Sequence, residues 1–231
     1  MERELKIDKR RSIRLKGYDY SATGAYFVTL CTHKKEPLFG RVIDGTMQMD
    51  NLGHIVEYEW LRSKAIRAEI ELDAFMVMPN HFHAIVCIFD NGTSINPVGA
   101  TGGSPAIGGS VTMGGSATVG ATGGSPINPC GPKPKSLSSL IAGFKSASAK
   151  RINEIRQLPG VPVWQRNYYE HVVRDEESLD KIREYISNNP LTWSLDRENP
   201  EREAEDPFEI WMETFRELRD KVQSERAGTR R

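Results

Sequence analysis

Hydrophobic residues in this chain concentrate first in short continuous runs. Residues 26–32, 70–78 and 81–89 are rich in β-branched and aromatic side chains, which favour extended backbone and predict three strands. Residues 39–49 predict a hairpin that turns at Asp44-Gly45, because both residue types tolerate the positive φ of a tight turn. Four segments are therefore expected to be extended.

Other hydrophobic residues recur every three or four positions and predict helices. The first should span 51–67, the second 136–154 and the third from 175 to the residue before Pro190, where a helix cannot continue normally. Asn51, Ser136 and Asp175 are the side chains expected to cap their first turns. The tail predicts a further helix with an apolar stripe formed by Phe208, Trp211, Phe215, Leu218 and Val222.

The pattern is interrupted between residues 91 and 135, where Gly, Ser, Thr, Ala and Pro dominate. The octapeptide at 98–105 is repeated at 119–126, which indicates a flexible loop that grew by duplication. Its glycines lack the lysine and the strand-to-helix context of a phosphate-binding loop. The chain is expected to comprise a basic arm at 1–17, one domain formed by 18–90 and 136–195, the insert at 91–135, and a charged helical tail at 196–231.

Composition narrows the class of protein. The chain has 231 residues, 38% of them hydrophobic, and a formal net charge of +0, which argues against a general DNA-coating protein. Three widely spaced cysteines without a CxxC pair do not predict a disulfide framework or a zinc knuckle. No run approaches the roughly 18 apolar residues of a membrane span, so a cytoplasmic protein is expected, and a nucleoid-associated one if it acts on DNA.

Candidate chemistry begins with Pro79-Asn80-His81-Phe82-His83, at the start of a predicted strand. Residues two apart in a strand point to the same face, so His81 and His83 can direct two imidazoles at one metal ion. Two histidines alone are more often incidental, and a third ligand is needed. The amide oxygen of Asn189 suits magnesium or manganese beside imidazole.

Tyr185 lies four residues before Asn189, so both side chains should project from one face of the third helix. A phenol has an unperturbed pKa of about 10 and attacks poorly unless a metal polarises its target. The alternative is a core aromatic residue followed by a helix-ending asparagine. Without the histidines, that alternative would be preferred.

Several blocks occur together in an order that resembles the REP-associated branch of the HUH-type tyrosine transposases. The matching blocks are Arg11–Leu15, Gly17–Tyr20, Gly24–Thr29, Val77–His83, Phe144–Ser146, Trp164–Arg166 and Tyr185–Pro190. They span residues 10–193 apart from the insert. The HxH pair followed by a YxxxN helix is specific as a set, although neither half is.

The resemblance implies an α+β fold, a ferredoxin-like HUH nuclease domain with an antiparallel sheet. It implies that His81, His83 and Asn189 bind Mg or Mn while Tyr185 nicks single-stranded, hairpin-forming repeat DNA through a 5′-phosphotyrosine. The released 3′-hydroxyl can later rejoin strands, which is the chemistry of a transposase. A homodimer is possible, in which Tyr185 could serve the partner's metal site.

Five residues are candidates for DNA contacts: Arg11, Arg14, Lys145, Trp164 and Arg166. For each, solvated surface or simple packing is the competing interpretation. Tyr168-Tyr169 is a less favoured position for the nucleophile. Two alternatives to the transposase remain: a hairpin-DNA-binding protein that does not cleave, and a metallohydrolase of small molecules or phosphoesters.

Overall fold

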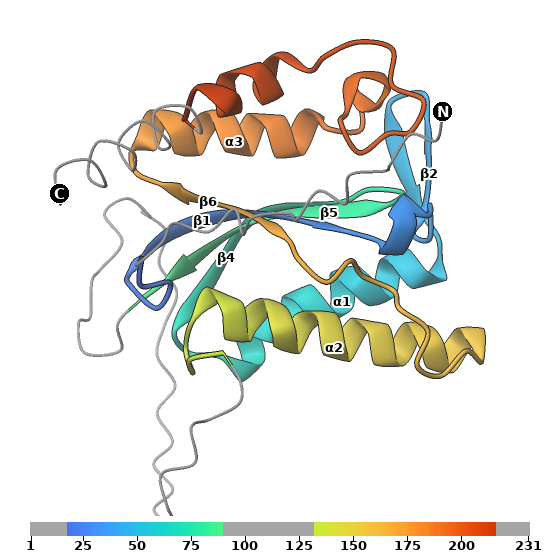
Figure 1. Cartoon of the computed structure of the whole chain (residues 1–231), viewed down its shortest axis with the longest axis horizontal. Helices are drawn as coiled ribbons and strands as arrows, with labels where there is room; N and C mark the ends of the chain where they lie inside the picture. Colours follow the sequence, from blue (N-terminus) through green and yellow to red (C-terminus); the bar gives the residue numbers. More distant parts are fainter. Residues whose placement is uncertain (1–17, 90–131, 216–231) are drawn as a thin grey trace, which may run out of the picture.

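A four-stranded antiparallel sheet forms the centre of the computed structural model, which describes residues 18–89 and 132–215 (Figure 1). Its strands lie in the order β4-β5-β1-β6. Their bounds are Gly24–Cys31 for β1, Ile70–Val77 for β4, His81–Ile88 for β5 and Tyr169–Val173 for β6. The three strands expected from the sequence are confirmed to within two residues at each end.

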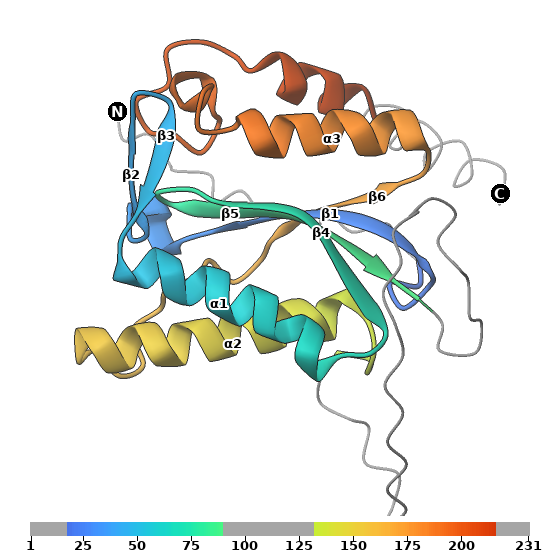
Figure 2. The same cartoon turned by 180° about the vertical axis from the view of Figure 1, so that it is seen from behind.

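The helices lie on both faces of this sheet. Helices α1 (Asn51–Ile66) and α2 (Leu137–Arg156) cover one face, and α3 (Glu176–Asn188) covers the other, as both views show (Figures 1 and 2). The order β1-α1-β4-β5-α2-β6 along the chain, with this strand order in the sheet, is the expected ferredoxin-like arrangement. The fold class is therefore confirmed as α+β with an antiparallel sheet.

Alternation along the central strands gives each face its own core. Phe82, Ala84 and Val86 of β5 face α1 and α2, where a cluster around Trp60 and Phe144 is buried. The intervening positions face α3, where Ile85 packs in a second cluster. His81 and His83 share the Ile85 side, so strand periodicity directs both imidazoles toward α3.

Local signals fix most element ends. Ser136 begins α2 with a capping box, and Asp175 begins α3 by accepting a hydrogen bond from the Ser178 N–H at 2.8 Å. The expected cap at Asn51 is wrong by one residue. Asp50 has the extended backbone of a cap, and its carboxylate accepts from the N–H groups of Leu52 and Gly53.

Short elements complete the described chain. The hairpin β2 (Gly40–Ile43) and β3 (Thr46–Met49) turns at Asp44 and Gly45, whose φ angles of 50° and 69° confirm the expected tight turn. Two 3₁₀ turns, η1 (His33–Lys35) and η2 (Trp193–Leu195), lie near the start of β5 and after α3. Residues 207–215 form a C-terminal helical segment that packs beside α3 (Figure 1). The insert and the basic arm lie almost entirely outside the described residues.

Within residues 18–89 and 132–215, no helix is both long and apolar enough to cross a membrane.

Candidate metal and tyrosine site

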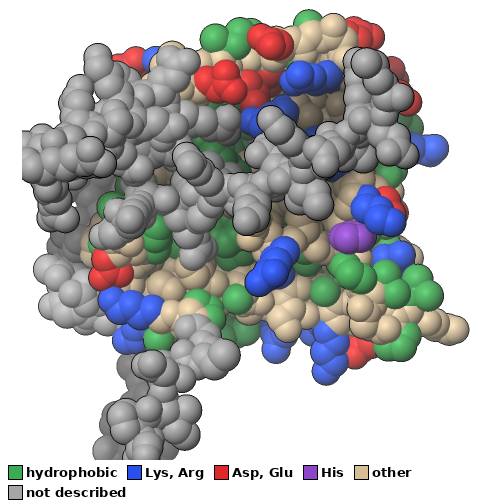
Figure 3. Space-filling view, viewed as in Figure 1, with side chains coloured by type: hydrophobic (Ala, Val, Ile, Leu, Met, Phe, Trp, Pro, Cys, Tyr) green, Lys and Arg blue, Asp and Glu red, His purple; other side chains and the backbone are tan. Residues whose placement is uncertain are grey.

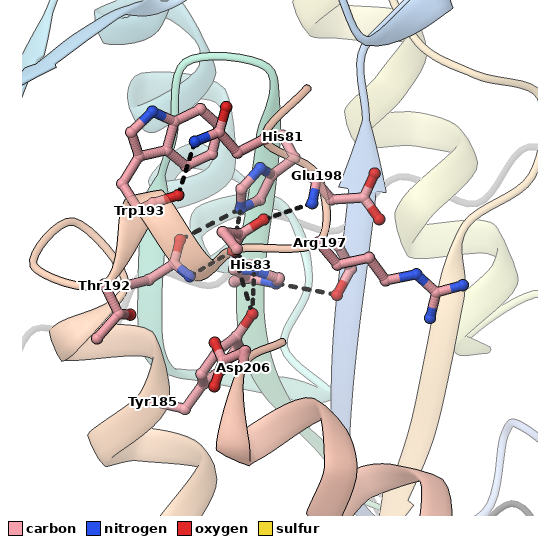
Figure 4. Close-up of polar contacts among 12 residues, drawn as sticks. His81, His83, Tyr185, Thr192, Trp193, Arg197, Glu198 and Asp206 are labelled. Atoms are coloured by element: carbon pink, nitrogen blue, oxygen red, sulfur yellow. Dashed lines mark hydrogen bonds and ion pairs between the residues drawn. The ribbon is translucent and has the colours of Figure 1, made fainter. Parts of the chain in front are cut away.

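The site lies between the first residues of β5 and the end of α3. Figure 4 shows His81, His83 and Tyr185 directed toward one another, with the chain from Thr192 to Glu198 folded over them. The Tyr185 hydroxyl lies 3.2 Å from His83 Nε2. Asn189 Oδ1 lies 3.3 Å from His81 Nε2. The two halves of the sequence motif, about a hundred residues apart, therefore meet in one buried cluster.

Asp196 is a member of this cluster that the sequence analysis missed. Its Oδ2 lies 3.8 Å from His81 Nε2, 4.0 Å from His83 Nε2 and 3.3 Å from the Tyr185 hydroxyl. Potential ligand atoms of His81, His83 and Asp196 all lie within 4.8 Å of one another. The available signal was the requirement for a third ligand, but the sequence analysis gave that role to Asn189 and assigned residues 196–231 to a charged helical tail.

Hydrogen bonds determine which nitrogen of His81 carries its proton. Asn80 donates both amide hydrogens to backbone carbonyls, of Lys35 at 3.2 Å and of Glu198 at 2.7 Å. Its Oδ1 is thereby turned to His81 Nδ1, at 3.0 Å. Because an amide oxygen only accepts, Nδ1 holds the proton and Nε2 presents a lone pair to the site.

The donor set fits a divalent cation. Asn189 gives an N–H to Asp196 Oδ2 at 2.6 Å, which turns its Oδ1 toward the unprotonated His81 Nε2. The lone pairs of His81 Nε2 and Asn189 Oδ1 consequently face each other without a proton between them, and the Asp196 carboxylate lies beside them, an arrangement that a cation stabilises. His83 Nδ1 bonds Thr29 Oγ1 at 2.9 Å, which orients its ring in the same way.

Burial controls the charge states. It lowers the pKa of His81 to about 4, so this ring is neutral near pH 7. Burial would raise the pKa of Asp196, but the two histidines and the Asn189 N–H outweigh it and hold that pKa below its usual range. Burial and the nearby Asp196 charge raise the pKa of Tyr185 well above its ordinary value, so the phenol keeps its proton.

The low pKa of His81 predicts a pH dependence of stability. Between pH 6.5 and about 4 the unfolded chain binds a proton at His81 that the folded chain does not. The free energy of unfolding should therefore fall as pH falls through this window, by up to about 3 kcal/mol. Asp196, whose folded pKa is depressed, adds its own loss only below about pH 4. Urea unfolding in chelator at several pH values measures the slope.

His81→Gln should flatten that slope, whereas His54→Gln should leave it unchanged because the His54 side chain is 60% exposed on α1. An equal slope in His81→Gln and the parent protein would contradict the assignment.

The C-terminal helical segment covers Tyr185. The Phe208 ring stacks on the Tyr185 ring at a centroid distance of 3.7 Å and an interplanar angle of 8°, and Tyr185 is only 8% exposed. Asp206 begins this segment by accepting the Phe208 N–H at 2.8 Å. The sequence analysis also missed Asp206. Burial raises the pKa of its carboxyl group, and its Oδ2 has no hydrogen-bond partner among the described residues. The described part of the predicted apolar stripe, Phe208, Trp211 and Phe215, thus packs in the same cluster as Tyr185, whereas Leu218 and Val222 lie outside the described residues.

Of the expected DNA-contact residues, the structure describes Lys145, Trp164 and Arg166. Trp164 is buried and donates its indole N–H to Ser148 Oγ at 2.9 Å, so its ring is not available for base stacking in this conformation and packing is favoured. Lys145 donates to the backbone carbonyls of the loop at 165–167, and burial lowers its pKa to about 8. Arg166 is exposed. Arg11 and Arg14 lie outside the described residues.

Positive charge on the visible surface is dispersed. On the face in Figure 3, Lys and Arg side chains are scattered among acidic and apolar groups wherever described atoms are seen. The DNA-contact assignments therefore remain predictions.

Comparison with known proteins gives one close sequence relative. No protein-family model matches the chain. A Haemophilus influenzae protein, described only as uncharacterized, is 36% identical over 196 residues, which cover 83% of this chain and 93% of that protein.

Two solved structures resemble the chain more distantly. One is a REP-associated tyrosine transposase bound to a REP hairpin, with 15% identity, a TM-score of 0.44, and coverage of 75% of this chain and 70% of that one. The other is a proposed transposase from Deinococcus radiodurans, with 16% identity, a TM-score of 0.33, and coverage of 76% and 95%. At these TM-scores we draw nothing about function from them. The extent of the sequence match shows that the chain belongs to the same family as the Haemophilus influenzae protein.

Proposed function

We propose that the protein is a metal-dependent single-stranded DNA endonuclease and strand transferase, a transposase of the HUH type, with Tyr185 as its nucleophile. One observation carries this proposal: the Tyr185 hydroxyl lies 3.2 Å from His83 Nε2, in the same buried cluster as His81, Asn189 and Asp196. A phenol beside a metal-type donor set has the chemistry required for phosphoryl transfer.

The proposed reaction forms one bond and breaks another at a single phosphorus atom. The Tyr185 oxygen bonds to the phosphorus and loses its proton, while the bond from phosphorus to the 3′ oxygen breaks and that oxygen gains a proton. The products are a 5′-phosphotyrosine and a free 3′-hydroxyl. The reverse attack by a 3′-hydroxyl rejoins strands without nucleotide hydrolysis.

The bound metal would polarise the scissile phosphate and offset its charge. His81, His83 and Asp196 would hold it, with Asn189 as the additional oxygen donor expected from the sequence. Mg or Mn suits this mixture of nitrogen and oxygen ligands. The chain's own contribution is to keep His81 Nε2 unprotonated and to orient the His83 ring and the phenol beside it.

The proposed substrate is single-stranded DNA next to a hairpin-forming repeat, as the sequence resemblance implies. Because Tyr185 lies beside His83 of its own chain, we propose that the tyrosine acts in cis, which requires no dimer. Binding should be salt-sensitive where cationic side chains meet phosphates.

The test is incubation with labelled hairpin DNA taken from beside the gene, with Mn²⁺ or with chelator, followed by denaturing electrophoresis. A metal-dependent adduct whose cross-linked peptide contains Tyr185 is the expected result. Turnover of phosphoesters without any trapped protein–DNA species would instead support a metallohydrolase.

A second candidate is a hairpin-DNA-binding protein that does not cleave. The covered state of Tyr185 favours it, since a phosphate cannot reach the phenol while Phe208 remains stacked on it. Native-gel binding without an adduct in any metal would support this alternative.

Removal of the Phe208 ring separates the two candidates. If Tyr185 is a nucleophile, Phe208→Ala should raise the rate of adduct formation about fivefold, because substrate need not displace a stacked ring worth roughly 1 kcal/mol. Phe215→Ala is the matched control, since Phe215 lies on the same segment but contacts His171 and Trp211. Equal rates in both variants would mean that the stack does not limit access.

A further inference from the structure

Asn80 is a buried residue next to His81 that has no role in the proposed reaction so far. It lies in the three-residue connection between β4 and β5, residues 78–80, and is only 1% exposed. Its side chain makes three hydrogen bonds, to His81 Nδ1, to the Lys35 carbonyl and to the Glu198 carbonyl. One amide therefore joins a metal-type ligand to two segments that are remote in sequence.

The bond to Glu198 bears directly on Asp196. The Glu198 N–H donates to Asp196 Oδ1 at 2.6 Å, while the Glu198 carbonyl accepts from Asn80 Nδ2. The Glu198 carboxylate also pairs with Lys35 Nζ at 3.0 Å. Asn80, Lys35 of η1 and Glu198 therefore all contact one another. The residues that present Asp196 lie in a turn, so contacts of this kind, and not helical periodicity, set its position.

A carboxamide side chain suits the three hydrogen bonds at this position. The position needs one acceptor for the His81 ring N–H and two N–H donors for two backbone carbonyls, and a carboxamide carries both kinds of group. An alanine would leave two buried carbonyls without these donors and would free the His81 ring to rotate or to change tautomer.

We propose that Asn80 is a positioning residue that assembles the metal centre, by fixing the His81 tautomer and by holding the turn that carries Asp196. The inference rests on the proposed function, because it assumes that the cluster binds a metal. Asn80 contacts no reacting group; it acts through His81 and Asp196.

Three measurements that compare the full-length parent protein with Asn80→Ala test the inference. Titration calorimetry with Mn²⁺ should show affinity 10–100-fold weaker, the usual range for loss of a ligand's hydrogen-bond partner, in Asn80→Ala. Nitrogen-15 NMR of the histidines should show His81 protonated at Nδ1 in the parent and altered in the variant. Amide exchange at Glu198 should become faster in Asn80→Ala.

Asn153→Ala is the matched control. Asn153 is also a buried asparagine whose Nδ2 donates to a backbone carbonyl, of Val161 at 2.8 Å, but it lies on α2. Its loss should lower thermal stability and leave Mn²⁺ affinity unchanged.

The outcomes separate cleanly. Parent-like affinity in Asn80→Ala, or equal loss in both variants, would overturn the inference while leaving the proposed function intact. A parent protein that binds no Mn²⁺ would overturn both. If Asn80→Ala fails to fold, the parent spectrum still decides, because an Nε2-protonated His81 would contradict the assignment.

Discussion

Tyr185→Phe should abolish the covalent protein–DNA adduct while leaving metal and DNA binding in place. The substitution removes the attacking oxygen together with its contacts to His83 and Asp196, but it keeps the metal-type donor atoms and the ring's stack against Phe208. Loss of a nucleophile from a catalytic unit typically lowers rates by many orders of magnitude, so the adduct should fall at least about 1,000-fold. Denaturing electrophoresis with Mn²⁺ and calorimetric titration of Mn²⁺ measure the two properties separately.

Tyr169→Phe is the matched control for this experiment. Tyr169 lies on β6, and its ring contacts Phe27, as that of Tyr185 does. It is also one of the doubled tyrosines considered as a less favoured nucleophile. An adduct that persists in Tyr185→Phe and disappears in Tyr169→Phe would move the nucleophile to β6.

Asp196→Asn is expected to have the largest effect on metal binding. The change keeps the shape of the side chain but removes the charge that lies 3.8 Å from His81 Nε2 and 4.0 Å from His83 Nε2. Mn²⁺ affinity should fall by more than about 100-fold, beyond the range for losing a ligand's hydrogen-bond partner, and adduct formation should fall with it. Calorimetry at one pH and salt concentration measures this directly.

Asp206→Asn distinguishes coordination from a general loss of negative charge. Asp206 is also buried near the site but is not among the residues whose ligand atoms converge. Its variant should lower Mn²⁺ affinity far less than Asp196→Asn. Parent-like affinity in Asp196→Asn would remove Asp196 from the ligand set and leave Asn189 as the third ligand that the sequence suggested.

The sequence predicted those parts of the site that depend on regular periods. Alternation along β5 places both histidines on one face, and the four-residue spacing on α3 brings Tyr185 and Asn189 together. Asp196 and Asp206 could not be found in this way. Asp206 lies at the start of the C-terminal helical segment, and Asp196 lies in a turn beyond α3, where its position follows from tertiary contacts such as the Asn80 bond to Glu198.

Trp164 illustrates a second limit. An aromatic residue beside an arginine is equally suited to stacking on a base or to filling a core, and its sequence neighbours do not distinguish these uses. In the structure its ring packs against Phe39 and Phe144 on the α1 and α2 side of the sheet. Which role Trp164 has depends on where the segment that leads into β6 lies relative to the core, and long-range packing decides that position.

The direction of β5 has a consequence for how this domain can be extended. The strand begins at His81 in the site and ends at Ile88, about 23 Å away at 3.3 Å per residue. The chain departs just after that distal end, and it returns near Tyr20, whose carbonyl accepts the Leu137 N–H. Residues added to this connection therefore enter and leave at the end of the sheet opposite the candidate site. The connection is a suitable insertion point for fused domains or labels, and its length can vary between relatives without displacing the residues proposed to react.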